Sequence, residues 1–242
     1  MNGPARRPAR VFFAVVLLAL TAAFAALGIW QMERRAWKHA LIAAVESRIH
    51  AEPGASPGPN AWARLNADRD AYRRIRLAGR FVPRGETLVR AVSDLGAGYW
   101  VLTPFDTGRF VVLVNRGFVA PERRKNPGAA PSGPVEVTGL LRLSEPGGGF
   151  LRRNDPVSGN WYSRDVAAIS RARGVVGAAP YFIDADAAHN APGAPVGGLT
   201  VVRFADNHAA YALTWFAMAL LAAGAAWYVA ARAPVDGMGE GA

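Results

Sequence analysis

Long apolar stretches without charge stand near both ends of the chain. Neither Val11 to Ile29 nor Tyr211 to Ala231 contains a charged residue. A helix rises about 1.5 Å per residue, so roughly 20 apolar residues cross the hydrocarbon core of a bilayer. The pattern predicts two transmembrane helices, with both termini on one side of the membrane and the chain between them on the other.

A secretory signal peptide is the alternative for the first stretch, because Arg6, Arg7 and Arg10 precede it. The apolar part of a signal peptide usually has about 7–15 residues and ends at a small-residue cleavage site. Here the apolar run is longer and continues into Trp30 to Arg35 without such a site. We interpret it as a retained helix. Helical spacing of apolar residues continues to Val45, and the prolines and glycines of 51–60 predict a linker after the helix ends near Ala51.

Short alternating or apolar runs predict a domain rich in strands. In Tyr72–Val82, apolar residues alternate with arginines, as in an antiparallel strand with one buried face. Further strands are expected at Glu86–Val92, Tyr99–Phe105, Phe110–Val119, Val135–Leu143, Tyr181–Ile183 and Thr200–Phe204, with a hairpin turn at Thr107-Gly108. Ser163–Arg173 has the spacing of a helix, with Val166, Ile169 and Ser170 on one face.

The expected fold is a membrane protein of the α+β class. Two transmembrane helices flank a mainly antiparallel β domain outside the cytoplasm, a sheet or small open barrel with one helix. The expected divisions are a cytoplasmic tail (1–10), the first span (11–30), a juxtamembrane helix and linker (31–60), the β-rich domain (61–206), the second span (207–231) and a second cytoplasmic tail (232–242). Basic residues on the two sides of the first span nearly balance, so this orientation rests on the size of the central domain.

The formal net charge of +10 comes almost entirely from arginine. It favours contact with anionic lipid or an acidic partner, and a base-rich genome is the alternative explanation. The arginines cluster between residues 64 and 90, where we expect any electrostatic docking surface. A domain outside the plasma membrane does not meet nucleic acid, and the chain has no basic-aromatic recognition motif.

The sequence lacks the usual motifs of catalysis. It contains no phosphate-binding loop with its lysine, no His-Glu-x-x-His, no Gly-x-Ser-x-Gly and no cysteine. We therefore expect no enzyme, and the scattered methionines do not suit a copper chaperone. Asp184 and Asp186 form a possible metal pair, but a solvated loop is the interpretation we favour.

The topology predicts a binding site. The outer ends of both helices must lie at the same membrane face, which brings Trp30, Gln31 and Arg34 to the level of His208 and Tyr211. Helical spacing also puts His208, Tyr211 and Trp215 on one face of the second helix.

Such a composite site suits a planar, amphipathic, acidic ligand. His208 offers an imidazole nitrogen to iron, the aromatic side chains offer a ring face, and Arg34 offers a partner for propionates. Haem at the membrane surface fits this description. The alternative is a belt of interfacial aromatic residues, in which Arg34 extends to the interface and His208 begins a helix capped by Asp206 or Asn207.

Five motifs resemble the Surfeit locus protein 1 family, in the order the family has them. They are Leu27-Gly-Ile-Trp-Gln-Met-Glu-Arg34, Gly98-Tyr-Trp-Val-Leu-Thr-Pro104, Val114-Asn-Arg-Gly-Phe-Val119, Trp161-Tyr-Ser-Arg-Asp-Val166 and Asn207-His-Ala-Ala-Tyr-Ala-Leu-Thr-Trp-Phe216. Phe118 replaces the family's tryptophan and Asp206 replaces its asparagine. The first change keeps an apolar ring, and the second keeps a helix-capping side chain.

The resemblance implies an assembly factor for haem-a-containing cytochrome c oxidase in the bacterial plasma membrane. It implies haem A as a transient ligand, and haem A synthase and the large oxidase subunit as partners. The family's histidine corresponds to His208, and its Trp-Gln-x-x-Arg motif to Trp30, Gln31 and Arg34, for which a propionate role is our own hypothesis. Asn115-Arg116-Gly117 is expected to hold a turn. The alternatives are an interaction chaperone that holds the unfinished subunit without haem and, ranked last, an enzyme acting on a lipid or haem precursor.

Overall fold

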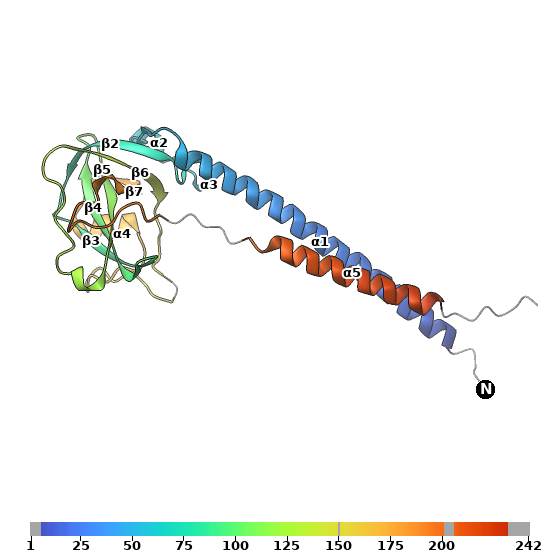
Figure 1. Ribbon diagram of the computed structural model, residues 1–242. Coiled ribbons are helices and arrows are strands. Elements are labelled where there is room, and N and C mark those ends of the chain that lie inside the picture. Colours follow the sequence, from blue (N-terminus) through green and yellow to red (C-terminus); the bar gives the residue numbers. More distant parts are fainter. Residues whose placement is uncertain (1–5, 150, 201–205, 232–242) are drawn as a thin grey trace, which may run out of the picture. The chain divides into compact units, whose positions relative to one another are not determined.

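The computed structural model describes residues 6–149, 151–200 and 206–231 (Figure 1). The chain divides into two compact units. One comprises residues 1–43 and 203–242, and the other comprises residues 44–202. The predicted strand at Thr200–Phe204 lies outside the described residues from Val201 onward.

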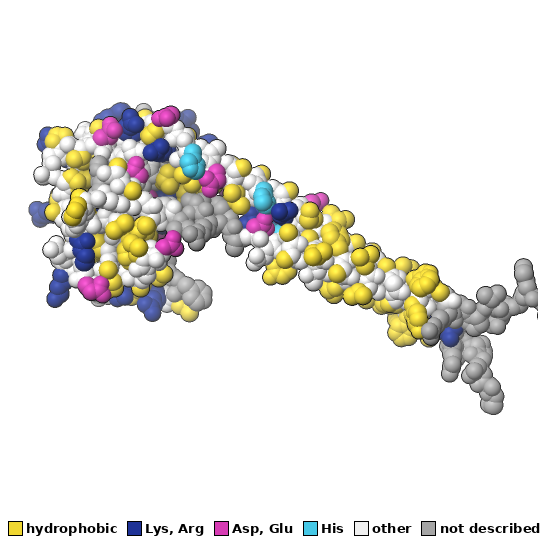
Figure 2. Space-filling view, viewed as in Figure 1, with side chains coloured by type: hydrophobic (Ala, Val, Ile, Leu, Met, Phe, Trp, Pro, Cys, Tyr) yellow, Lys and Arg dark blue, Asp and Glu magenta, His cyan; other side chains and the backbone are white. Residues whose placement is uncertain are grey.

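The first unit consists of two long helices. Helix α1 spans Arg6–His50, its last turns belonging to the second unit, and α5 spans His208–Ala231. The predicted end of α1 near Ala51 is confirmed, and both helices are long and apolar enough to cross a membrane. Hydrophobic side chains make up much of their visible face in Figure 2. Many of these are strongly exposed, including Phe12, Leu213, Leu220 and Trp227.

Small residues let α1 and α5 approach closely. Ala212, Ala219, Ala222 and Ala226 are the buried side chains of α5. On α1, Gly28 is buried so tightly that an added Cβ would lie 2.5 Å from the ring of Phe216. Phe24 stacks on Trp215 with ring centroids 5.8 Å apart. Backbone proximity of this kind is typical of paired transmembrane helices, where packing and not hydrophobicity drives association.

The second unit is built around one sheet that closes on itself. Its strands are β1 (Gly54–Ala55), β2 (Arg74–Phe81), β3 (Thr87–Ser93), β4 (Gly96–Asp106), β5 (Val111–Val119), β6 (Val135–Leu143) and β7 (Ala178–Ala185). Their order is β1-β2-β6-β7-β5-β4-β3, and β2 also pairs with β4. That extra pairing joins β2, β6, β7, β5 and β4 into a small barrel. Most pairs are antiparallel, as predicted, but β1–β2 and β5–β7 are parallel.

Two apolar clusters lie on opposite faces of the sheet. The barrel interior is filled by Ile75, Leu77, Phe105, Val112, Val114, Val137, Leu141, Tyr181 and Ile183. Val89, Leu102, Leu113, Trp161, Val166, Ile169 and Phe182 form the other cluster, beneath helix α4 (Val166–Arg173). Strand β5 contributes to both through Val112, Leu113 and Val114, which explains why this part of its sequence is continuously apolar instead of alternating.

The shorter helices depart from the prediction in detail. Helix α4 begins three residues later than expected, because the side chain of Asp165 caps it by accepting the N–H of Ala168. Residues 51–60, interpreted as a linker, contribute strand β1 and the start of helix α2 (Pro59–Trp62). A further short helix, α3, spans Ala67–Asp70. Short 3₁₀ helices, η1 and η2, occupy Pro121–Arg123 and Ala187–His189.

The predicted turn at Asn115-Arg116-Gly117 is wrong, because all three residues lie inside β5. Gly117 nevertheless has a φ of 133°, a conformation that favours glycine. A Cβ at this position would also lie 2.3 Å from the backbone of Val196, whose chain pairs with Phe118. The glycine therefore allows a second segment to pack directly against β5.

Candidate functional site

Asp206, two residues before the first residue of helix α5, fixes where the helix begins. Asp206 accepts the backbone N–H of His208 at 3.1 Å, and the N–H of Tyr211 bonds to the carbonyl of Asn207 at 3.2 Å. The first contact satisfies an N–H group that has no partner within the helix, and the second is the first regular hydrogen bond of the helix. As a result, His208 is the first residue of the helix, one residue after the predicted start of the second span and as expected for a cap at Asp206 or Asn207.

His208 is joined to helix α1 through Gln31. The Nδ1 atom of His208 lies 2.7 Å from the Oε1 atom of Gln31, and the pair is partly buried. An amide oxygen only accepts hydrogen bonds, so Nδ1 carries a hydrogen, and in the neutral ring Nε2 then has the lone pair. A neutral imidazole held in this way is a typical metal ligand, since the bond at one nitrogen orients the ring and makes the other nitrogen more basic.

Asp206 joins α1 to α5 a second time. One carboxylate oxygen lies 2.7 Å from Nε2 of His39 and 3.5 Å from Nε of Arg35. The backbone N–H of His208 does most to lower the pKa of Asp206, burial opposes this, and His39 and Arg35 lower the pKa further. Asp206 is therefore an anion at neutral pH, and it links a cationic stretch of α1 to the first turn of α5.

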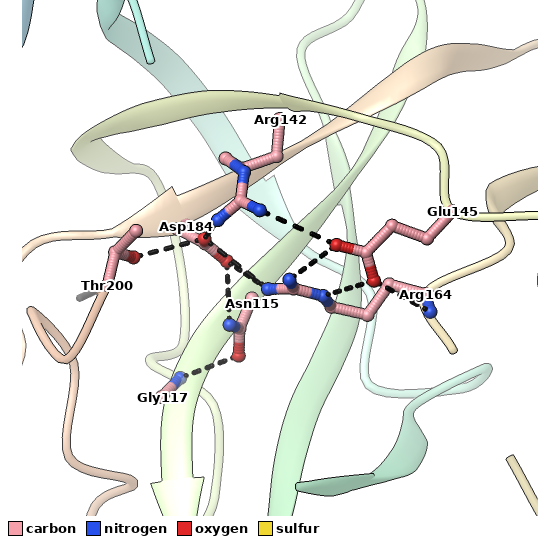
Figure 3. A network of polar contacts seen from close by, with 7 residues as sticks. All are labelled: Asn115, Gly117, Arg142, Glu145, Arg164, Asp184 and Thr200. Atoms are coloured by element: carbon pink, nitrogen blue, oxygen red, sulfur yellow. Dashed lines mark hydrogen bonds and ion pairs between the residues drawn. The ribbon is translucent and has the colours of Figure 1, made fainter. Parts of the chain in front are cut away.

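A separate polar network lies inside the β-rich unit (Figure 3). Its centre is Asp184 on β7, which is only 4% exposed. The carboxylate accepts bonds from Asn115 at 2.7 Å, Arg142 at 3.0 Å, Thr200 at 3.0 Å and Arg164 at 3.1 Å. The interpretation of Asp184 as part of a solvated loop is wrong, whereas Asp186 does lie beyond the strand and caps η2.

Glu145 completes this network from the loop after β6. It accepts a bond of 2.6 Å from Arg164, which also lies 4.6 Å from the ring centroid of Phe182. Burial lowers the pKa of Arg164, but the charges of Asp184 and Glu145 outweigh it and raise that pKa. The charges of the network are therefore paired with one another. This arrangement is typical of a structural network that joins neighbouring segments, and not of a metal site. Among the residues that the structure describes, no group of three or more His, Cys, Asp or Glu side chains could hold a metal ion.

The family model that matches this chain is that of the SURF1 family, and the match covers residues 18–220. This chain belongs to the SURF1 family. The matched range includes both ends of the Gln31–His208 contact and the whole Asp184 network.

Curated relatives resemble the chain over most of its length. Surfeit locus protein 1 of Mus musculus is 37% identical over 84% of this chain and 70% of the mouse protein. The Homo sapiens protein of the same name is 35% identical over 86% of this chain and 74% of its own length. A SURF1-like protein of Monosiga brevicollis is 34% identical over 85% of this chain and 82% of its own length. These three relatives are eukaryotic, so the bacterial origin stays a prediction.

The structure brings together some of the site residues predicted for this SURF1 family member. Gln31 contacts His208, and Trp215 packs against α1 through Phe24. Trp30 and Tyr211 are 52% and 56% exposed on the outer surface of the helix pair. Arg34 is also exposed, and its guanidinium lies 4.1 Å from the ring centroid of Trp37.

Sequence reasoning missed Arg35 and His39, which contact Asp206. Together with Gln31 they recur every four residues along α1, the spacing that places side chains on one helix face. The sequence instead predicted Trp30, as an aromatic contact, and Arg34, as a partner for propionates. The four-residue spacing of positions 31, 35 and 39 would have predicted which face of α1 contacts Asp206 and His208.

Proposed function

We propose that this protein is a membrane-anchored assembly factor for haem-a-containing cytochrome c oxidase, which holds haem A as cargo and helps to place it in the large oxidase subunit. Membership of the SURF1 family supports the assembly role. The hydrogen bond from His208 to Gln31 is the observation that carries the haem part of the proposal, because it leaves Nε2 as a preformed ligand atom.

The other residues of the helix pair fit a porphyrin. Phe24 and Trp215 supply apolar ring surface next to the first turn of α5. Nε of Arg35 is buried and faces Asp206, but the side chain as a whole is partly exposed, so its outer N–H groups can donate to a carboxylate. Trp30, Arg34 and Tyr211 stay proposed contacts, since their exposed side chains are available to a ligand at the helix surface. When bound, the haem iron supplies an electron-pair acceptor for Nε2.

The proposed setting is a bacterial plasma membrane. Exposed apolar side chains on α1 and α5 would contact lipid, which supports their assignment as two spans. The proposed divisions place residues 1–10 and 232–242 in the cytoplasm and the β-rich domain outside it. At that outer face, haem A synthase and the large oxidase subunit are the proposed donor and acceptor.

Transfer without covalent chemistry follows from this arrangement. One imidazole on an open helix pair binds haem more weakly than a closed pocket with two axial ligands. The affinity of His208 must stay below that of the oxidase, because otherwise the cargo would remain on the carrier. This role needs a ligand atom and an oriented ring, and no acid–base pair.

A visible spectrum of the purified full-length protein, co-expressed with haem A synthesis, tests the proposal. We expect a Soret band that co-purifies with the wild type and is lost or shifted in His208→Ala. His50→Ala is the matched control, because His50 is exposed and its only polar partner among the described residues is Glu46 on its own helix. Circular dichroism of both variants checks that the fold is unchanged.

An unchanged Soret band in His208→Ala would exclude this histidine as the ligand. A colourless wild type under haem A supply would favour the alternative, an interaction chaperone that stabilises the nascent subunit. In that case the residues at the helix ends would be an interfacial aromatic belt.

A further inference from the structure

A groove of about 430 Å³ lies along the last strand of the sheet. Its walls carry Arg90 on β3, Tyr99 on β4, and Arg152 and Tyr162 from the segment between β6 and α4. Small residues, among them Ala91, Ala97, Gly98 and Gly149, line the remainder and leave room for a ligand chain. The polar network around Asp184 contributes no residue to this lining.

Arginine and tyrosine side chains alternate along this groove and at its border, where Arg124 adjoins the lining residue Tyr99. The guanidinium of Arg124 lies 5.3 Å from the ring centroid of Tyr99, and that of Arg90 lies 5.9 Å from the same centroid. Arg90 is also 5.6 Å from the centroid of Tyr162, which has Arg152 at 5.6 Å. These distances are in the range of cation–π contacts, which position a guanidinium while its N–H groups stay free to donate.

These three arginines differ from the basic residues near the sheet that pair with buried carboxylates. Arg69 and Arg73 pair with Asp70, and Arg142 and Arg164 pair with Asp184. Within residues 6–149, 151–200 and 206–231, no carboxylate pairs with Arg90, Arg124 or Arg152. The protein therefore presents three oriented cations whose charge is not balanced locally.

The alternation of cations and aromatic rings favours one class of ligand. A tyrosine ring separates each guanidinium from the next, so one phosphate or one carboxylate is too small to join all three. In an extended polypeptide, alternate side chains project on one side about 7 Å apart. Carboxylates at alternate positions of such a chain match a row of separated arginines.

The backbone beside the groove supports the same ligand. Strand β3 is the last strand of the sheet, and Trp161 pairs with its outer edge at Val89 and Arg90. Beyond that point, Ala91 to Ser93 present an edge to which an extended chain can add by backbone hydrogen bonds. Val92 is 83% exposed on this edge and offers an apolar contact.

We propose that this groove binds an extended acidic segment of a partner protein, whose carboxylates pair with Arg90, Arg124 and Arg152. This goes beyond haem placement and does not depend on it, since none of these residues belongs to the helix pair. It gives the protein a docking surface for a polypeptide that is separate from the proposed cargo site.

The test measures binding of a fluorescein-labelled eight-residue peptide of alternating glutamate and valine. The full-length protein is held in nanodiscs of neutral phosphatidylcholine, and binding is followed by fluorescence anisotropy. We expect the double variant Arg90→Gln/Arg152→Gln to raise the Kd by about tenfold or more. The matched control Arg84→Gln/Arg171→Gln removes the same charge from exposed positions outside the groove, and we expect it to change the Kd less than about twofold.

Equal weakening by both double variants would overturn the proposal, because net charge alone would then explain binding. Displacement of the peptide by inorganic phosphate at the same concentration as the peptide would show that the groove binds small anions instead. Binding to phosphatidylglycerol vesicles that depends on Arg90 and Arg152, without peptide binding, would show a lipid site. The single variant Arg124→Gln removes one charge at an exposed position. An unchanged Kd in both this variant and Arg90→Gln/Arg152→Gln would also contradict the proposal.

Discussion

The Nδ1 atom of His208 and the Oε1 atom of Gln31 lie 2.7 Å apart, although 177 positions separate the two residues in the sequence. Each comes from a different end of the chain, and each has a defined chemical role in the pair. Gln31 accepts the hydrogen bond, and no described residue forms a hydrogen bond with the second nitrogen of His208. The orientation of the imidazole therefore depends on a residue outside its own helix.

Replacing Gln31 with leucine should weaken haem retention without unfolding the protein. Leucine has a similar size but accepts no hydrogen bond, so the ring of His208 loses its orientation. Loss of such a supporting contact typically lowers metal affinity about 10–100-fold. The Soret absorbance per protein after repeated washing measures this effect. Gln31→Glu keeps an acceptor at the same position and should retain haem, so loss of haem in Gln31→Glu with retention in Gln31→Leu would contradict the role of this bond.

Replacing Gly28 with leucine should separate the helices and reduce haem retention. An added side chain would collide with the ring of Phe216, which then must move and shift α1 relative to α5. Gly224→Leu is the matched control on the same helix pair, because a Cβ there meets nothing within 4 Å. Haem content and the tryptophan fluorescence of both variants report the change. Similar effects of the two substitutions would show that the contact at Gly28 has no special importance.

Replacing Asp184 with alanine should destabilise the β-rich unit by about 3 kcal/mol, since two partly buried arginines lose their shared carboxylate. Arg76→Met is the control, because Arg76 and Glu136 form an exposed ion pair whose loss should cost less than about 1 kcal/mol. Thermal unfolding of the full-length protein in detergent, followed by circular dichroism, compares the two. Equal shifts in the unfolding temperature would mean that the buried network contributes no more than a surface pair.

Asp70 should make stability depend on pH in the acidic range. Burial raises the pKa of its carboxyl, but hydrogen bonds from Arg69, Asn66 and Arg73 outweigh this and lower the pKa from 3.8 to about 2. The folded state therefore binds this proton less readily than the unfolded state does. The resulting stability is complete above about pH 4 and is lost as the pH falls toward 2.

We expect a contribution of about 1 kcal/mol from Asp70, because the exposed Arg69 is screened by solvent. Thermal unfolding at pH 6 and pH 3 measures it. Asp70→Asn should lose part of the difference between the two pH values, and Asp68→Asn, at an exposed neighbouring position, should not. An unchanged pH dependence in Asp70→Asn would contradict this assignment.

Local patterns in the sequence predict much of the fold. The alternation of Ile75 and Leu77 with Arg74 and Arg76 identifies β2, because one face of that strand is buried and the other is exposed. Long-range pairing leaves no such local signal. The parallel contact of β5 with β7 and the closure of β2 on β4 depend on segments far apart in the chain.

The contacts of Asp184 were also not predictable from the local sequence. An aspartate after a short apolar run usually marks a loop, and sequence alone did not show that Arg142 and Arg164 approach it from other elements. The helix pair was more predictable, since two spans must bring Gln31 and His208 to one level. The rotation of α1 about its axis was not fixed by that argument, so Arg35 and His39 were missed.

The separation of Gln31 from His208 also sets the order in which the protein can mature. At about 5–20 residues per second, a ribosome needs roughly 10–35 seconds to add the 177 positions between them. During that interval α1 exists without its partner helix, and no ligand pair is present. Under the proposed function, the haem site can therefore form only when synthesis has reached α5, so an unfinished chain would take no cargo.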